Sequence, residues 1–280
     1  MSATPVRPTR LVTSPDGVPI AVFSAGNGPP LVLVHGAAAD HTTFRVVGPR
    51  LAERFTIHAI DRRGRGASGD GTTYALEREF DDLAAVVDAV AAESEQPVDV
   101  VGHSFGGRVA LGASLRTPNV RRLVIYESAP AAPGRPYAQP GLAEELATLR
   151  AAGRSDELYA TFLRRVVGMA EADIAAYRAE PVWPVRVAAA PTIVRELEVE
   201  GHDGTLDALG GVAVPVLQLL GGDSPEAFRA ATAALHARLA NGRVVVIDGA
   251  RHAAHHSHPD RFVAEVVRFV DRAGGATAEA

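Results

Sequence analysis

The clearest chemical pattern is Gly-His-Ser-Phe-Gly at residues 102–106, which directly follows an apolar, β-branched run at residues 98–101. A strand that turns at once into a helix holds the central residue in a strained conformation and lifts its hydroxyl above the sheet. The two glycines suit a turn where neighbouring backbone comes too close for a Cβ. Because a helical pattern follows at residues 107–111, the context favours a nucleophile at Ser104 over an ordinary strand-to-helix turn.

A serine hydroxyl needs a neighbouring base to accept its proton, and histidine is the usual base. His252 is the leading candidate because it follows a β-branched run at residues 244–247 across a short Asp-Gly-Ala-Arg segment. A residue just past the last strand of a parallel sheet lies at the carboxyl edge, where Ser104 is also expected. His236 falls inside a helical pattern and His202 lies in a long segment without strands, so neither fits as well.

Neither a metal nor a nucleotide cofactor is expected. The histidines clustered at residues 252–258 have no Asp or Glu at helical spacing among them, so the cluster departs from zinc-ligand patterns. Gly64-x-Gly66-x-x-Gly69 formally matches a dinucleotide fingerprint. However, the polar residues 70–73 follow it in place of the helix start that would bind a phosphate.

Eight segments are predicted strands because they are rich in apolar and β-branched residues. Several are continuous apolar runs, which are typical of strands buried on both faces of a parallel sheet. Helical patterns between them predict right-handed βαβ units, and Pro-Asp-Gly at residues 15–17 predicts a hairpin joining the first two strands. The predicted strands are residues 10–13, 20–24, 31–34, 56–60, 98–101, 123–126, 214–219 and 243–247.

Residues 128–211 interrupt this alternation, because they contain no convincing strand and are far longer than an ordinary loop. We predict that they form a helical cap inserted into a core domain made of residues 1–127 and 212–280. Trp183 and Tyr137 of the cap are candidates to line an apolar substrate pocket. After a linker rich in Pro and Gly, helices are predicted at residues 142–152, 156–167, 171–179 and 185–200.

Composition excludes several classes of protein. The 280 residues are 47% hydrophobic, which suits one large domain with an insertion. The net charge of −5 argues against a nucleic-acid partner. The absence of lysine and cysteine removes Schiff-base chemistry and thiolate nucleophiles. No apolar run reaches the roughly 20 residues that span a bilayer, and no secretory signal is recognisable, so we expect a cytoplasmic monomer or homodimer without a membrane partner.

Four motifs, in the expected order and spacing, resemble the α/β-hydrolase family. The motifs are Leu-Val-Leu-Val-His-Gly at residues 31–36, Asp-Arg-Arg-Gly-Arg-Gly-Ala-Ser-Gly at 61–69, Gly-His-Ser-Phe-Gly-Gly at 102–107, and Gly-Ala-Arg-His with Pro-Asp-Arg-Phe at 249–262. The resemblance covers about residues 10–126 and 214–271, and the predicted cap carries no such signature. It implies an α/β fold with an eight-stranded, mostly parallel sheet flanked by helices, and an inserted helical cap.

The resemblance also implies roles for individual residues. Ser104 would be the nucleophile and His252 the base. The backbone N–H groups of Ala37 and Phe105 would donate to the oxyanion formed during the reaction. His35, close to the first of these donors in the chain, would belong to the substrate-binding residues.

Two carboxylates are candidates for the acid that orients His252. Asp223 follows the strand that most often carries the acid in the family, although the usual spacing falls on Ser224. Glu127 directly follows the strand predicted at residues 123–126, where some members, including certain dehalogenases, carry an acid. Spacing favours Glu127, and both residues are kept as candidates.

Together, the residues and the resemblance predict a serine hydrolase. It would cleave an ester or thioester of a small, largely apolar substrate through an acyl-enzyme intermediate, without a cofactor. A serine at the nucleophile position argues against epoxide hydrolase and haloalkane dehalogenase activities, which need a carboxylate there. Three alternatives use the same site: hydrolysis of a carbon–carbon bond, cofactor-free perhydrolysis, and ligand binding by a protein that has lost turnover.

Overall fold

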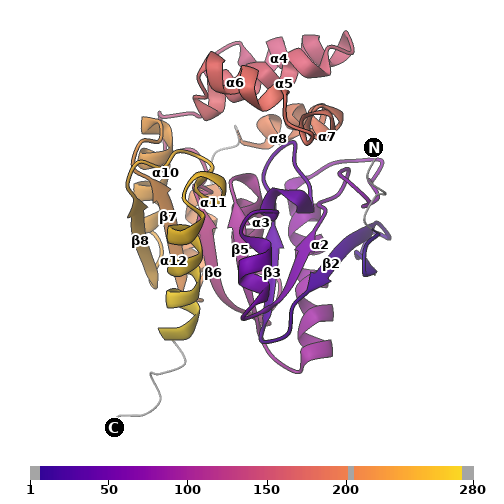
Figure 1. The fold of residues 1–280 in the computed structure, drawn as a ribbon, viewed down its shortest axis with the longest axis vertical. Coiled ribbons are helices and arrows are strands. Elements are labelled where there is room, and N and C mark those ends of the chain that lie inside the picture. The colour runs from indigo at the N-terminus through magenta and orange to yellow at the C-terminus, as the bar shows by residue number, and fades with distance from the viewer. Residues whose placement is uncertain (1–6, 201–204, 273–280) are drawn as a thin grey trace.

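A single eight-stranded sheet forms the centre of the molecule in the computed structural model, which describes residues 7–200 and 205–272 (Figure 1). The strand order is β1-β2-β4-β3-β5-β6-β7-β8, and β2 runs antiparallel to both of its neighbours while the remaining pairs are parallel. The strands are β1 (Arg10–Thr13), β2 (Pro19–Ala25), β3 (Pro30–Val34), β4 (Thr56–Ile60), β5 (Val98–His103), β6 (Val120–Tyr126), β7 (Val216–Gly221) and β8 (Gly242–Ile247).

The fold class and all eight predicted strands are confirmed, with ends that differ by at most three residues. The central strands are apolar because helices cover both faces of the sheet; every residue of β3 and β7 is buried. One apolar cluster joins the sheet to α2 (Leu76–Ser94), α3 (Phe105–Ala113) and α10 (Glu226–His236). A second cluster includes residues of α1 (Gly48–Ala52) and α12 (Pro259–Arg272) on the opposite face.

Helices α4 to α8, which follow β6, form a separate layer at the upper end of the view in Figure 1, beyond the carboxyl ends of the parallel strands. Its side chains build an apolar cluster of their own, which reaches Ala38 in the loop after β3. The helices of this layer are α4 (Leu142–Ala151), α5 (Ser155–Phe162), a π-helical turn η2 (Leu163–Val167), α6 (Glu171–Arg178), α7 (Trp183–Ala189) and α8 (Thr192–Glu200). The next elements, α9 (Thr205–Ala208) and η3 (Leu209–Gly211), instead pack in the first cluster, against the sheet, through Leu206 and Leu209.

The single helix predicted over residues 185–200 is wrong, because the structure divides it into α7 and α8. Pro191 lies at the break, and a proline inside a helix removes a backbone donor and clashes with the preceding turn. His202 lies outside the described residues. Two short helices near the sheet edge complete the fold, η1 (His41–Phe44) and α11 (Ala254–Ser257). Among the described helices, none combines the length and apolar character needed to cross a membrane.

Candidate functional site

Ser104 occupies the sharp turn between β5 and α3. Its backbone has φ 52° and ψ −129°, a conformation that residues other than glycine rarely adopt. A Cβ on Gly102 would collide with the backbone of Gly107, and one on Gly106 would collide with backbone oxygens after β3. Both glycines are therefore needed for the turn, as the sequence predicts, and the turn directs Ser104 toward the carboxyl edge of the sheet.

His252 lies in the loop after β8, where its ring contacts Glu127 from the end of β6. The distance from His252 Nδ1 to Glu127 Oε2 is 2.6 Å, and the Glu127 side chain is fully buried. The other carboxylate oxygen accepts hydrogen bonds from Gly221 N, at 2.8 Å, and from Ser224 Oγ. Because an ionised carboxylate only accepts, His252 donates through Nδ1–H and leaves Nε2 free to accept a proton.

Asp223, the second candidate acid, does not take this position. The residue is exposed, and its backbone N donates to the carbonyl of Ala250 at 2.9 Å. Its neighbour Ser224 is buried and donates its hydroxyl to Glu127. The position after β7 thus contributes a hydroxyl that orients a carboxylate coming from β6.

Ser104 and His252 line two cavities beneath the helical layer. The smaller cavity has a volume of about 50 Å³ and mostly apolar walls, which include Tyr137, Phe162 and Ile193. The larger cavity has a volume of about 390 Å³ and extends between the loop after β3 and helices α5 to α7. A substrate bound across both cavities would place its reacting bond beside Ser104 and His252.

The two predicted oxyanion donors lie close to Ser104. Both Ala37 and Phe105 line the smaller cavity. Phe105 is the first residue of α3, so its N–H has no acceptor within the helix. The loop that carries Ala37 approaches the serine closely, because a Cβ on Gly36 would lie 2.9 Å from Ser104 Cβ.

Of the three residues predicted to bind substrate, only Tyr137 lines either of these two cavities. Its hydroxyl donates to the carbonyl of Ala129 at 2.8 Å, which leaves the ring to form part of the wall. Trp183 instead packs in the apolar cluster of the helical layer, and its Nε1 donates to Asp156 at 2.7 Å. A helical pattern predicts that an aromatic ring is buried, but not which cavity or cluster it joins.

His35 is fully buried beneath the site and lines neither cavity. Its Nδ1 donates to the carbonyl of Gly36 at 2.8 Å, and its Nε2 accepts from the backbone N of Arg62 at 3.0 Å. Burial and the charge of Arg62 hold the pKa of His35 well below its ordinary value. His35 therefore joins the loops after β3 and β4 and does not contact the cavities that would hold a substrate.

His103, which the sequence analysis did not single out, contacts the loop of His252. Its Nε2 donates to the main-chain carbonyl of His252 at 2.8 Å. Burial and the neighbouring His252 hold the pKa of His103 well below its ordinary value, so the ring is neutral. Its place directly before Ser104 was the only sequence signal for this contact.

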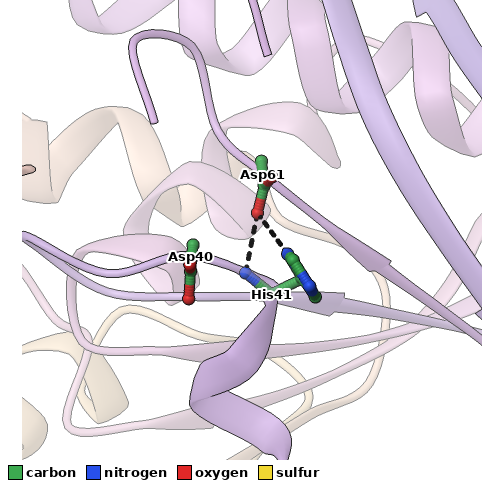
Figure 2. Close-up of side chains that lie close together, drawn as sticks. All are labelled: Asp40, His41 and Asp61. Atoms are coloured by element: carbon green, nitrogen blue, oxygen red, sulfur yellow. Dashed lines mark hydrogen bonds and ion pairs between the residues drawn. The ribbon is translucent and has the colours of Figure 1, made fainter. Parts of the chain in front are cut away.

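Figure 2 shows a cluster of Asp40, His41 and Asp61 whose ligand-type atoms lie within 4.8 Å of one another. Protein donors already occupy the carboxylates. Asp61 accepts from His41 N at 2.8 Å, from His41 Nδ1 at 2.9 Å and from Ala67 N at 2.8 Å. Asp40 accepts from Arg186 at 2.7 Å. These residues fit a hydrogen-bond network that braces the loops after β3 and β4, and they do not fit a metal ion.

Comparison with known proteins finds relatives that match most of the chain. A pimeloyl-[acyl-carrier protein] methyl ester esterase from Neisseria meningitidis serogroup B is 30% identical over 246 residues, covering 85% of this chain and 92% of that protein. The crystal structure of an alpha/beta hydrolase from Sphaerobacter thermophilus is 33% identical, with a TM-score of 0.82 and coverage of 93% of this chain and 100% of that one.

A mycobacterial protein named "Probable oxidoreductase EphD", from Mycobacterium tuberculosis, is 42% identical over 115 residues. The match covers 39% of this chain but only 19% of that protein's length. The model of the alpha/beta hydrolase family matches residues 31–265, a range that begins in β3 and ends in α12. Since that range contains the serine turn, the loop of His252 and the helical layer between them, the chain belongs to the alpha/beta hydrolase family.

Proposed function

We propose that this protein is a serine hydrolase that cleaves a carboxylic ester or thioester through an acyl-enzyme intermediate. The observation that carries the proposal is the buried 2.6 Å contact between His252 Nδ1 and Glu127. This contact fixes the imidazole tautomer that a serine nucleophile requires. The strained turn at Ser104, on the wall of the same cavities, supplies the nucleophile.

In this mechanism Ser104 Oγ attacks the substrate carbonyl while His252 Nε2 takes the hydroxyl proton. Glu127 stabilises the imidazolium that forms, and the N–H groups of Ala37 and Phe105 stabilise the oxyanion. His252 then returns the proton to the departing alcohol or thiol, which leaves Ser104 acylated. A water molecule attacks the acyl group with the same base, and the acid product and free serine result.

The walls of the smaller cavity support a small and mostly apolar group on one side of the reacting bond, because the cavity is narrow and has few polar groups. We further infer that residues 128–211 form a cap that excludes water and selects substrates. Helix α5 contributes side chains to both cavities, α6 and α7 to the larger one, and α8 to the smaller one. Ester hydrolysis is the activity named for the Neisseria relative, which is consistent with this assignment.

Covalent labelling with a fluorophosphonate, followed by intact mass measurement, tests the proposal. We expect one adduct on the wild-type protein and none on Ser104→Ala. The matched control is Ser257→Ala, which removes an exposed serine that lies five residues after His252 and lines neither cavity. Folded wild-type protein that acquires no adduct, and hydrolyses no ester in a panel of chain lengths, would contradict the proposal and favour ligand binding without turnover.

A further inference from the structure

The larger cavity combines cationic side chains from both layers of the molecule. Arg45, which follows η1, and Arg186, from α7, both line it beside Ser104 and His252. Resting on the proposed function, we propose that this cavity binds a carboxylate carried by the substrate, so that the enzyme prefers esters with a free acid group. The chemistry on which this depends is the pairing of a planar guanidinium with a planar carboxylate.

Arg45 is the group best placed to bind such an acid. Its side chain is exposed, and no carboxylate among residues 7–200 and 205–272 lies within ion-pair distance of it. The nearby Arg50 and Arg54 differ, because each already pairs with a carboxylate. Arg50 pairs with Asp260, and Arg54 pairs with Asp271 at 2.9 Å; none of these residues lines either cavity. Most guanidinium donors of Arg45 are therefore available to a ligand in the larger cavity.

Arg186 adds positive charge to the same wall but is already paired. Its Nη1 donates to Asp40, which precedes η1, at 2.7 Å, and its Nη2 donates to Thr42 of η1 at 3.1 Å. The pair is almost completely buried, so loss of Arg186 would leave the Asp40 charge without its partner. Arg186 therefore holds α7 against the segment after β3. Substitution of Arg45 is the change that tests whether the cavity recognises the charge of a ligand.

His256 adds no charge of its own to this cavity. His256 Nε2 lies 3.4 Å from Arg45 Nη1. Burial, together with the charges of Arg45 and Arg186, lowers the pKa of His256 to about 4, so the ring is neutral near pH 7. Burial is the largest of these causes, and the two arginines, which are the next largest, also favour the binding of an anion.

Glu180 is the opposing charge. It lines the larger cavity from the segment after α6, and its side chain is exposed. Arg45 and Glu180 are therefore the exposed charges of opposite sign on this wall, since the charge of Arg186 is balanced by Asp40. Coulomb's law then gives opposite expectations for the two exposed residues: loss of Arg45 weakens the binding of an anionic ester, and loss of Glu180 strengthens it.

The test uses two pairs of esters. The two members of each pair are equal in size and differ in charge. Monomethyl adipate ends in a carboxylate, and the methyl ester of adipamic acid ends in a neutral carboxamide. The acetate ester of 6-hydroxyhexanoic acid and its amide form the matching pair with the acid on the alcohol side. Release of methanol or acetate gives kcat/KM for each ester. We expect the wild-type enzyme to prefer the carboxylate of at least one pair, and the preference to fall as salt screens the exposed Arg45.

In Arg45→Gln the preference should fall about tenfold, which corresponds to loss of about 1.4 kcal/mol from one charge-assisted contact. Arg45→Glu should reverse the preference, and Glu180→Gln should increase it. Arg50→Gln is the matched control, because it removes an exposed arginine that lines neither cavity, and it should leave the ratio between paired esters unchanged.

Equal kcat/KM for charged and neutral esters in both pairs would overturn the inference, as would an unchanged preference in Arg45→Gln. These outcomes differ from failure of the proposed function. If neutral esters are hydrolysed and Ser104 is labelled without any charge preference, only the carboxylate subsite is wrong. If neither hydrolysis nor labelling occurs, the proposed function is wrong as well.

Discussion

The side chain of His103 supports the main chain of His252: Nε2 of the first residue donates to the carbonyl of the second at 2.8 Å. Tyr126 supports the same loop, because its hydroxyl donates to the carbonyl of Arg251. The ring of His103 also packs between those of His252 and His255, with centroid distances of 4.8 and 4.4 Å. The residue before the serine therefore positions the loop that carries the proposed base.

Replacement of His103 should reduce turnover more than substrate binding. We expect His103→Phe to lower kcat by about a hundredfold with a small change in KM, because a slight displacement of the base matters mainly in the transition state. His103→Gln, which keeps a side-chain donor, should recover part of the loss. Steady-state kinetics and the rate of fluorophosphonate labelling measure the effect, with thermal unfolding as the control. A His103→Phe enzyme with wild-type kcat would show that the contact has no part in catalysis.

Substitution of the two candidate acids should separate their roles. Glu127→Gln keeps the shape of the side chain but removes the charge that stabilises the His252 imidazolium, so we expect kcat to fall by about four orders of magnitude. Asp223→Asn alters an exposed carboxylate and should change kcat less than twofold. Measurements of kcat on one neutral ester decide the matter. A large loss in Asp223→Asn with little loss in Glu127→Gln would contradict the assignment.

Ser224 should act through Glu127. Its hydroxyl donates to the carboxylate oxygen opposite the one that contacts His252. Removal of this donor leaves Gly221 N as the remaining donor to that oxygen among the described residues, so we expect Ser224→Ala to lower kcat on a neutral ester about tenfold through a less well oriented His252. Ser224→Thr, which keeps a hydroxyl, should recover most of the wild-type kcat. An unchanged kcat in Ser224→Ala would show that Gly221 N alone is sufficient to hold the carboxylate.

The buried charges between the sheet and the helical layer should make stability depend on pH. Glu79 accepts from Arg62 at 2.6 and 2.8 Å. Burial alone would raise its pKa, but Arg62 and Arg65 lower it from 4.5 to about 2. A carboxyl group with a lowered folded-state pKa stabilises the protein fully above the unfolded value, so its contribution is lost as the pH falls from about 4.5 toward 2.

Glu79→Gln should accordingly destabilise the protein at neutral pH, by about 3–5 kcal/mol if the loss matches that of other broken buried ion pairs. The difference from wild type should shrink as the pH falls from 4.5 toward 2, since the unfolded wild-type chain then takes up a proton at Glu79 before the folded protein does. Denaturant unfolding at several pH values measures both effects. A difference that stays constant down to pH 3 would show that the Glu79 charge does not contribute in this way.

Local sequence patterns were sufficient for the strands, the serine turn and the position of His252. A β-branched run before Gly-x-Ser-x-Gly determines its own conformation, because each residue acts on near neighbours through steric contact and burial. The fold class follows from the same patterns, since alternating strands and helices have few compact arrangements. The division of the 185–200 segment was also present locally, in Pro191.

The tertiary structure decided how distant side chains meet. Glu127 and Asp223 each follow a strand at the carboxyl edge of the sheet. Only the path of the chain beyond that edge decides which of the two carboxylates contacts His252. Glu127 has φ 48°, and its carboxylate contacts a ring 125 residues away. Trp183 and His35 line neither cavity for the same reason. A sequence pattern predicts that a side chain is buried, but the packing of the surrounding elements determines which neighbours it contacts. The sequence by itself determined which groups could react, and packing determined which of them touch.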